Sequence, residues 1–545
     1  MKTGTCVATV VLSIMAVMAD EKEWTPFEAT GTVFQAGGNW LPEGVPGAED
    51  TARFTTAGSY PVVFTGSAVN TNVIAGSSDG TEAIFDLAGN SWQIGILSFQ
   101  NSAVARFNGG ALQVGAQVTT LGTGRRLILE GGAASFLGGL SIASGGALDI
   151  RGGEHACAGL SLINPCEEGF SLRMTAGSFV MDSAATLNLN LHSRLILQGG
   201  FFMTSSSRND VYGDTVIEVQ SNATFVSQAS FIFARTSRNT AALNILGGTV
   251  TNQQGMVFTA PTSGGRICST GIVNLVDGLY VVPTGKSLYI GSTGSYHGTN
   301  CLAVLRQSGG RAEVSGGSGN IYVGYYWATQ GVIDMTGGSA WYGGNIQVGG
   351  SSTATGVVQV AGGTLAAAAS VQLGRAAEGS GFLFHCGGDL SISNKLTVGT
   401  VEDSYGCLIA AAPTPLYVKN ELEVGYGVES TAELIVRSNA VCTAGSIQVY
   451  NKGVPPRIRF EACGEGLGML VARGNLSIAS GAKLEVDVTG YRGSDVWIKL
   501  IDCGGSRTGT FAAEDITVTG YGFVRQDVDQ GIWLFRPRGT FISVL

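Results

Sequence analysis

A short sequence pattern, two apolar residues around a variable one and then usually a small residue, returns along the second half of this chain of 545 residues. The spacings between successive fourth residues are 25, 32, 33, 25, 25, 25, 26 and 25 residues. An almost constant interval of this length indicates a repeat architecture in which each unit stacks on the next. The copies are Phe231-Ile232-Phe233-Ala234, Met256-Val257-Phe258-Thr259, Leu288-Tyr289-Ile290-Gly291, Ile321-Tyr322-Val323-Gly324, Ile346-Gln347-Val348-Gly349, Val371-Gln372-Leu373-Gly374, Leu396-Thr397-Val398-Gly399, Leu422-Glu423-Val424-Gly425 and Ile447-Gln448-Val449-Tyr450.

Each interval also holds a second short strand and a Gly-rich corner, as in residues 331–338 and 356–363. A third strand often follows, such as residues 364–367. Three short strands with Gly-rich corners fill about 25 residues, which is one coil of a parallel solenoid. The sequence therefore predicts an all-β fold, a right-handed parallel β-helix with β-rich caps at its ends.

Successive side chains on a strand point to opposite faces, so the recurring triplets also predict a register. The two apolar residues point into the coil and the middle residue points out. We expect one buried stack of Leu288, Ile321, Ile346, Val371, Leu396, Leu422 and Ile447. The predicted outer ladder consists of Tyr289, Tyr322, Gln347, Gln372, Thr397, Glu423 and Gln448.

Composition agrees with short strands and tight turns. The chain has 83 Gly but only 12 Pro, with 13% charged and 44% hydrophobic residues, which excludes both collagen and a disordered chain. Gly suits corners because it adopts left-handed backbone conformations without a steric penalty. The net charge is -9 and no Lys/Arg run is present, so nucleic acid is not an expected partner.

The N-terminus predicts export. Met1-Lys2, an apolar stretch over residues 6–18 and the small residues Val17 and Ala19 are typical of a secretory signal peptide cut after residue 19, the alternative being an uncleaved anchor. No later stretch is apolar enough to span a bilayer, so no transmembrane anchor is expected in the mature chain. The predicted organisation is a signal peptide at 1–19, an N-terminal cap at 20–60, the β-helix at 61–480 and a C-terminal β-rich cap at 481–545.

Nine cysteines remain after residue 19, and an exported protein meets oxidising conditions. Cys268 and Cys301 lie in corresponding insertions one coil apart, which predicts a disulfide between them, with Cys157 and Cys166 as a second, local bridge. The alternative is that these residues are reduced and pack as small apolar side chains.

Candidate chemistry is sparse. No CxxC spacing, no clustered histidines and no calcium-binding Gly-Gly-x-Gly-x-Asp repeat is present, so no metal and no cofactor is expected. Glu154-His155 with Glu167-Glu168 is either a polar cluster or a solvated loop. No acidic pair recurs one coil apart, as a polysaccharide lyase or hydrolase site would require.

The most suggestive residues are aromatic. Tyr289, Tyr322, Tyr325, Trp327 and Trp341 fall within two or three coils, with Tyr326 and Tyr342 beside them. Exposed aromatic rings stack on sugars or anchor interfaces, whereas buried ones merely cover the shaft. The first five are the predicted ligand-binding residues.

Several segments resemble secreted, Gly-rich β-helical proteins related to the autotransporter-associated β-strand repeat passengers. Near the N-terminus these are residues 38–40, 44–47, 50–54, 60–64 and 85–90, and near the C-terminus residues 500–505 and 508–511. The middle coils match the usual repeat of that family. The resemblance does not extend to a translocator barrel or to a C-terminal sorting tail, and its motifs specify no activity.

Two functions follow as expectations. The first is a structural or adhesin-like protein, secreted or at a bacterial cell surface, which displays a binding surface for glycans or other surface proteins and has no catalytic activity. The alternative is a carbohydrate-active β-helix enzyme of the lyase or hydrolase type.

Overall fold

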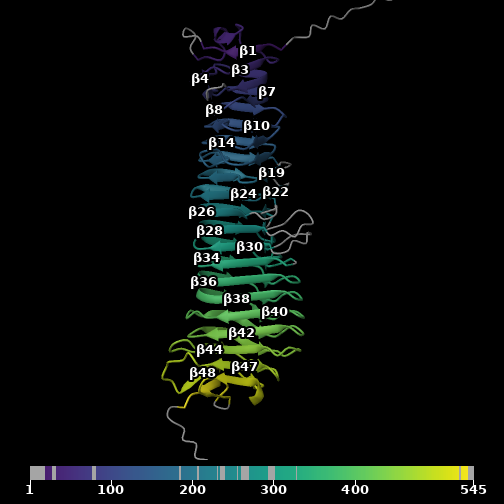
Figure 1. Ribbon diagram of the computed structural model, residues 1–545, viewed down its shortest axis with the longest axis vertical. Coiled ribbons are helices and arrows are strands. Elements are labelled where there is room, and N and C mark those ends of the chain that lie inside the picture. The colour runs from purple at the N-terminus through teal and green to yellow at the C-terminus, as the bar shows by residue number, and fades with distance from the viewer. Residues whose placement is uncertain are drawn as a thin grey trace, which may run out of the picture.

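A computed structural model describes residues 19–26, 32–76, 82–182, 186–204, 208–229, 231–233, 240–254, 256–258, 269–291, 301–326, 328–526 and 529–537. The chain is nearly all strand and forms a β-solenoid of about 16 turns with coils about 25 residues apart. Figure 1 shows the strands stacked along one long shaft, with the two ends of the chain at opposite ends. The predicted parallel β-helix is confirmed.

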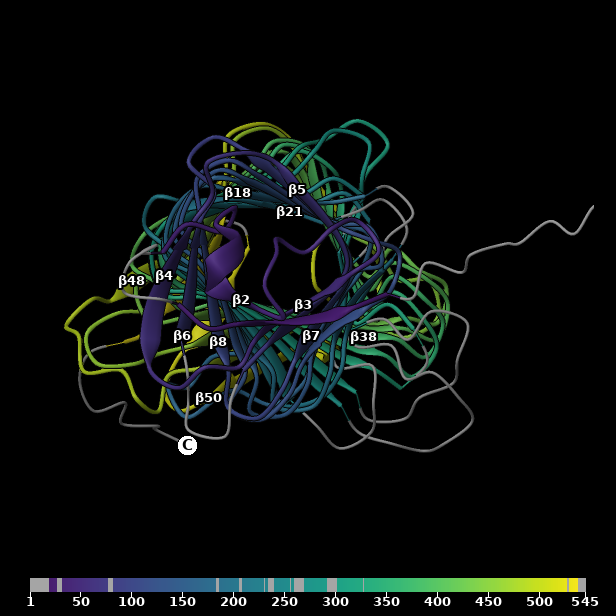
Figure 2. The ribbon, with the colours of Figure 1, turned by 90° about the horizontal axis from the view of Figure 1, so that it is seen from above.

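Each coil contributes strands to three faces, which we name A, B and C in chain order, and which surround one central core (Figure 2). Some strands bend around a corner and belong to two faces. Face A contains β4 (Ser59–Val63), β6 (Glu82–Asp86), β8 (Val104–Asn108), β11 (Arg126–Leu129), β14 (Ala147–Ile150), β17 (Leu172–Met174), β20 (Arg194–Leu197), β23 (Thr215–Gln220), β30 (Leu302–Gln307), β33 (Gln330–Met335), β40 (Tyr405–Ala410), β42 (Thr431–Arg437), β44 (Arg457–Glu461), β47 (Lys483–Asp487), β50 (Ile516–Thr519) and the first halves of β26 (Thr240–Asn252), β28 (Thr270–Val282), β36 (Thr355–Ala367) and β38 (Ser380–Ile392).

Face B contains the second halves of those four strands and the first halves of β5 (Ala68–Ala75), β7 (Ser91–Phe99), β41 (Leu416–Val424) and β43 (Val441–Val449). Its other strands are β9 (Ala111–Val114), β12 (Ala133–Phe136), β15 (Glu154–Cys157), β18 (Ser178–Met181), β21 (Gly200–Met203), β24 (Ala223–Ser227), β31 (Arg311–Val314), β34 (Ser339–Tyr342), β45 (Met469–Ala472) and β48 (Trp497–Cys503).

Face C carries the recurring triplets and the second halves of β5, β7, β41 and β43. Its other strands are β1 (Glu21–Trp24), β3 (Thr51–Phe54), β10 (Thr119–Leu121), β13 (Leu140–Ile142), β16 (Leu160–Leu162), β19 (Thr186–Leu189), β22 (Arg208–Val211), β25 (Phe231–Phe233), β27 (Met256–Phe258), β29 (Leu288–Ile290), β32 (Ile321–Val323), β35 (Ile346–Val348), β37 (Val371–Leu373), β39 (Lys395–Val398), β46 (Leu476–Ile478) and β49 (Arg507–Thr508).

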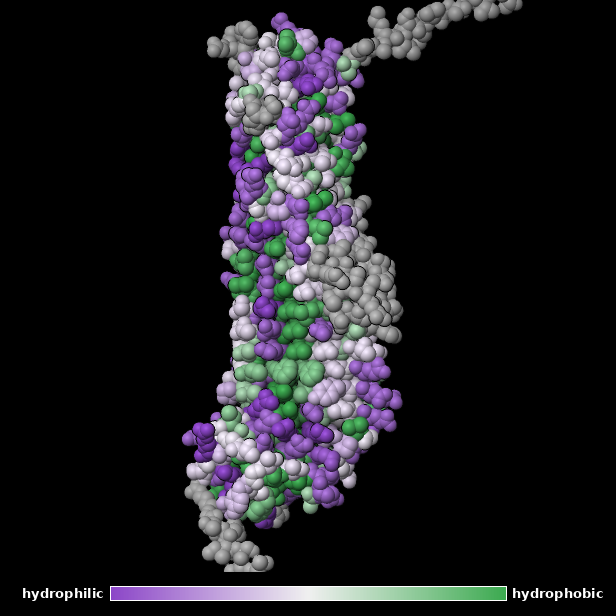
Figure 3. Space-filling view, in the orientation of Figure 1, coloured by the Kyte–Doolittle hydropathy of each residue, from purple (hydrophilic) through white to green (hydrophobic). Residues whose placement is uncertain are grey.

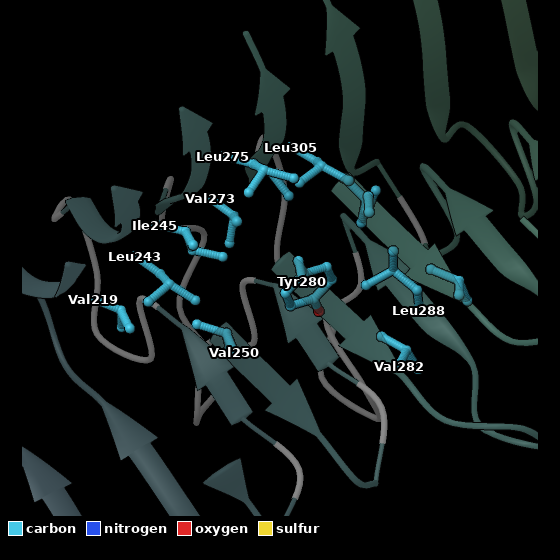
Figure 4. Packing of buried hydrophobic residues seen from close by; sticks show 14 of the residues in the cluster. Val219, Leu243, Ile245, Val250, Val273, Leu275, Tyr280, Val282, Leu288 and Leu305 are labelled. Carbon is cyan, nitrogen blue, oxygen red and sulfur yellow. The ribbon is translucent and has the colours of Figure 1, made fainter. Parts of the chain in front are cut away.

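The predicted buried stack on face C is confirmed. Strand pairing places Leu288, Ile321, Ile346, Val371, Leu396, Leu422 and Ile447 side by side in that order. All seven side chains are buried. They belong to one apolar column that runs through the shaft, part of which Figure 4 shows between faces A, B and C.

Glycine follows the triplet because of both conformation and space. Gly349 and Gly374 have φ values of +70° and +68°, in the left-handed region. A Cβ on Gly349 would lie 2.5 Å from the backbone of Ser380, and one on Gly374 would lie 2.7 Å from the carbonyl oxygen of Tyr405. Another residue type would therefore separate the neighbouring turns.

The two ends of the shaft are closed differently. At the N-terminal end β1 pairs parallel with β3 and antiparallel with β2 (Trp40–Leu41), and the rings of Trp24 and Trp40 pack edge to face over the core with centroids 5.0 Å apart. At the C-terminal end parallel pairing continues past residue 480 to β50. There β52 (Ile532–Phe535) pairs antiparallel with β48 and with β51 (Phe523–Arg525). Two 3₁₀ turns lie at Gly37–Asn39 and Ala513–Asp515.

Candidate functional site

Three of the predicted ligand-binding tyrosines come together on the outside of face C. Register pairs Tyr289 of β29 with Tyr322 of β32, and their rings stack with centroids 4.7 Å apart and planes at 13°. Tyr325, in the corner after β32, places its ring 4.1 Å from that of Tyr322, and Tyr326 meets Tyr325 edge to face at 4.9 Å. We call these four residues the tyrosine cluster.

The phenols of Tyr289 and Tyr325 are neutral hydrogen-bonding groups. Burial raises the pKa of Tyr289 and of Tyr325 above the ordinary value of a tyrosine. Asn320 donates a hydrogen bond of 2.9 Å from Nδ2 to the hydroxyl of Tyr322. The cluster therefore offers half-buried aromatic rings together with hydroxyl groups on one surface, which is suited to stacking and hydrogen bonding with a ring-shaped polar ligand.

The other predicted aromatic residues do not complete this group. Trp341 lies on β34 of face B, where it is 42% exposed, because the chain between β32 and β34 passes through face A. Its neighbour Tyr342 points inward and is fully buried. Trp341 therefore lies on a different face from the three tyrosines, and Trp327 lies outside the described residues.

The outer ladder of face C continues from the cluster only in part as predicted. Gln347 and Gln372 follow Tyr322 and are half-buried between neighbouring rungs. Thr397 and Glu423 are buried instead of solvent-facing. Thr397 donates a 2.9 Å hydrogen bond to Glu423, and Lys395 forms an ion pair of 3.1 Å with the same carboxylate, so these side chains cover one another.

A charged network covers the N-terminal part of face A. Asp149 on β14 is fully buried and forms ion pairs with Arg126, Arg151 and Arg173 at 2.7 to 3.0 Å. Burial by itself would raise the pKa of Asp149, but hydrogen bonds from Arg173 and Arg126 outweigh that effect and lower it. Phe170 lies under two of the guanidinium groups, with that of Arg173 4.5 Å from the ring centroid. The network holds neighbouring coils together.

Sequence reasoning missed this network. Arg126 and Arg173 lie in the coils before and after that of Asp149: register pairs Arg126 with Ala147 and pairs Asp149 with Arg173. The signal in the sequence was the pair of charged residues Asp149 and Arg173 at equivalent places in successive strands. It was hidden because the recurring triplets that align the coils begin only at Phe231.

Beside the network, a cleft of about 680 Å³ opens at the corner between faces C and A. Arg125, Arg126, Glu167 and Glu168 line it, and Glu168 forms ion pairs with Arg126 and, at 3.8 Å, with Arg173. Of the two alternatives for Glu154-His155 and Glu167-Glu168, the polar cluster does not form, because β15 places Glu154 and His155 on face B.

The predicted Cys157–Cys166 bridge is not formed, and both residues have free thiols. Cys157 ends β15 and points into the core, whereas Cys166 lies in the corner before β17, so the chain passes through β16 between them. Burial raises the pKa of Cys157 to about 12. Cys301 is buried, and the predicted bridge to Cys268 involves a residue outside the described ones.

The described ranges contain no group of three or more His, Cys, Asp or Glu residues arranged to hold a metal ion. No helix in these ranges has the length and hydrophobicity of a membrane-spanning segment.

The fold and the site define the class of this protein: it is a parallel β-solenoid with an external tyrosine cluster. The chain matches no known protein family, and a search of curated proteins finds no similar sequence.

Proposed function

We propose that this chain is a structural or adhesin-like protein, secreted or at a bacterial cell surface, that binds glycans through its tyrosine cluster and performs no catalysis. The observation that supports the proposal is the packing of Tyr289, Tyr322 and Tyr325 against one another on the outside of a long shaft. Flat rings supply apolar contact area at a low conformational cost, and phenol hydroxyls bind sugar hydroxyls. Gln347 and Gln372, on the next two rungs, extend the surface with amide groups.

The first test is a glycan array probed with the purified protein, followed by calorimetry on the glycans that bind. Replacing Tyr322 by Ala removes the ring that contacts both neighbours, and we expect it to weaken binding about tenfold or more. Tyr322→Phe keeps the ring and isolates the contribution of the hydroxyl. Trp341→Ala is the matched control, because it removes an exposed aromatic ring of face B in the following coil and should leave binding unchanged.

The same glycans serve in a reducing-end release assay. Binding without release supports the proposal, and release of new reducing ends would favour the alternative of a carbohydrate-active enzyme. Absence of binding to any glycan would contradict the proposed ligand class.

Export is tested separately by fractionating the producing bacterium and sequencing the N-terminus of the mature protein. We expect the protein outside the cytoplasm with a first residue of Asp20, as the signal-peptide pattern predicts. Cytoplasmic protein that still begins at Met1 would contradict this part of the proposal.

A further inference from the structure

Face A carries a line of apolar side chains on the outside of the shaft. Register places them one per coil over seven consecutive coils, and each is half-buried between its neighbours. Six steps of about 4.8 Å give a length of about 29 Å. In Figure 3 a hydrophobic band runs along the axis in the middle of the molecule, beside a line of hydrophilic residues. The members of this apolar stripe are Val216, Ala242, Ile272, Val304, Val332, Val357 and Phe382.

The stripe is not part of the core. The residue after each member points inward and is buried, as Leu305 and Ile333 illustrate for β30 and β33. These strands are therefore apolar on both sides, whereas a strand with one solvated face normally alternates apolar and polar residues. An outward apolar line of this length indicates a surface that another molecule covers.

The surroundings of the stripe are almost free of charge. From β26 to β38, the outward residues on its two sides are Thr, Ser, Asn, Gln, Leu and Phe, apart from one ion pair of 3.6 Å between Arg306 and Asp334. Both ends of face A, by contrast, carry mixed charges, such as Arg173 with Asp149 and Arg457 with Glu433. The middle of the face, with one ion pair per copy, can therefore be removed from water at a lower electrostatic cost than either end.

The shape of the stripe selects the partner. A straight line of about 29 Å is covered along its whole length only by an equally straight surface, and another copy of the shaft offers the same line with the same spacing of about 4.8 Å. The neutral area spans the six coils from β26 to β38, about 24 Å, and six-residue strands make it about 20 Å wide, or about 480 Å². Its flanks supply the rest of the roughly 800 Å² per partner of a stable interface. Positive and negative side chains are mixed at both ends of face A, so these ends do not repel a second copy through charge of a single sign.

We infer that two copies of the chain pack face A against face A along the apolar stripe, antiparallel about a two-fold axis at Val304. In this arrangement Ile272 of one copy contacts Val332 of the other, and Ala242 contacts Val357. Small residues thus oppose larger ones, as close packing requires. The tyrosine clusters on face C remain exposed on both shafts, so this dimer does not depend on the proposed glycan binding.

Sedimentation velocity of the full chain tests the inference. Between about 1 and 100 µM we expect a concentration-dependent shift from monomer to dimer. Val332→Lys places a cation in the apolar contact twice per dimer and should raise the dimer Kd at least about tenfold. Gln347→Lys adds the same charge on face C of the same coil and should leave the Kd unchanged. Thermal unfolding shows that both variants are folded.

A complementary mixture tests the antiparallel register. Ile272→Glu alone should also weaken the dimer, but mixing it with Val332→Lys should restore dimers, because the new Lys and Glu face each other across the axis. A wild-type chain that stays monomeric at about 100 µM would overturn the inference. A dimer whose Kd is unchanged by Val332→Lys would also overturn it. So would a wild-type chain that stays monomeric and whose apolar stripe binds only small apolar probes. Weakened single variants without rescue in the mixture would overturn the antiparallel arrangement.

Discussion

Arg173 binds both carboxylate oxygens of Asp149, donating hydrogen bonds of 3.1 Å from Nε and 2.7 Å from Nη2. The two residues occupy the same position on consecutive coils. Replacing Asp149 by Asn leaves three guanidinium groups around a neutral buried side chain. Breaking a buried ion pair on one side costs about 3 to 5 kcal/mol, so we expect a loss of this size in the free energy of unfolding, measured by denaturant titration.

Asp334→Asn is the control for that measurement. It removes a carboxylate whose partner Arg306 is 58% exposed, and exposed pairs contribute less than about 1 kcal/mol. Equal losses of unfolding free energy in the two variants would show that the burial of Asp149 does not determine its contribution to stability.

Two buried histidines predict destabilisation in mild acid. Burial lowers the pKa of His155 and of His385 below the ordinary value of 6.5. As the pH falls below that value, the unfolded chain binds protons while the folded chain remains neutral. Stability is therefore complete above about pH 6.5 and falls by up to about 1.4 kcal/mol per pH unit for each histidine until the folded pKa is reached.

Unfolding titrations at pH 7 and pH 5 measure this effect. His385→Gln should reduce the difference between the two pH values, because it removes one of the two buried imidazoles. An unchanged pH dependence in His385→Gln would contradict the assignment.

Val371→Asp tests the register of face C. Val371 is 2% exposed and lies between Ile346 and Leu396 in the apolar column, where an unpaired carboxylate has no partner. We expect destabilisation of several kcal/mol and loss of folded, protease-resistant protein. Gln372→Asp places the same group one residue further on, pointing outward, and should retain protease resistance. Wild-type resistance in Val371→Asp would refute the register.

The cysteines should separate into two classes in an alkylation experiment. Cys386 and Cys463 are exposed and should react in the native protein. Cys157 and Cys442 are buried, with pKa values that burial raises to about 12, and should react only after unfolding. Mass spectrometry of non-reduced peptides identifies the labelled sites and also tests the predicted Cys268–Cys301 bridge. Rapid native labelling of Cys442 would contradict its burial.

The fold was predictable because it depends on local alternation and on a repeated length. Val371 points inward and Gln372 points outward because successive side chains of a strand lie on opposite faces. A nearly constant coil spacing repeats this alternation on every rung. The tyrosine stack was predictable to the same extent, since Tyr289 and Tyr322 occupy the same place in their triplets.

What the sequence did not provide was the position of each residue around the shaft. Trp341 is only 16 residues further along the chain than Tyr325, yet it lies on another face because one coil passes through all three faces. Cys157 and Cys166 are separated for the same reason. The apolar stripe was missed because its members, such as Val332 and Val357, are adjacent in sequence to core residues of the same chemical type.

The sequence alone thus determined the coil, its spacing and the inward column, because these follow from periodicity along the chain. Only the tertiary structure decided which outward side chains share a face and which become buried. Glu423 shows the difference: its triplet predicts an exposed position, but Lys395 and Thr397 from the preceding coil cover it. Outward burial depends on neighbours about 25 residues away, and the pattern within one strand carries no information about them.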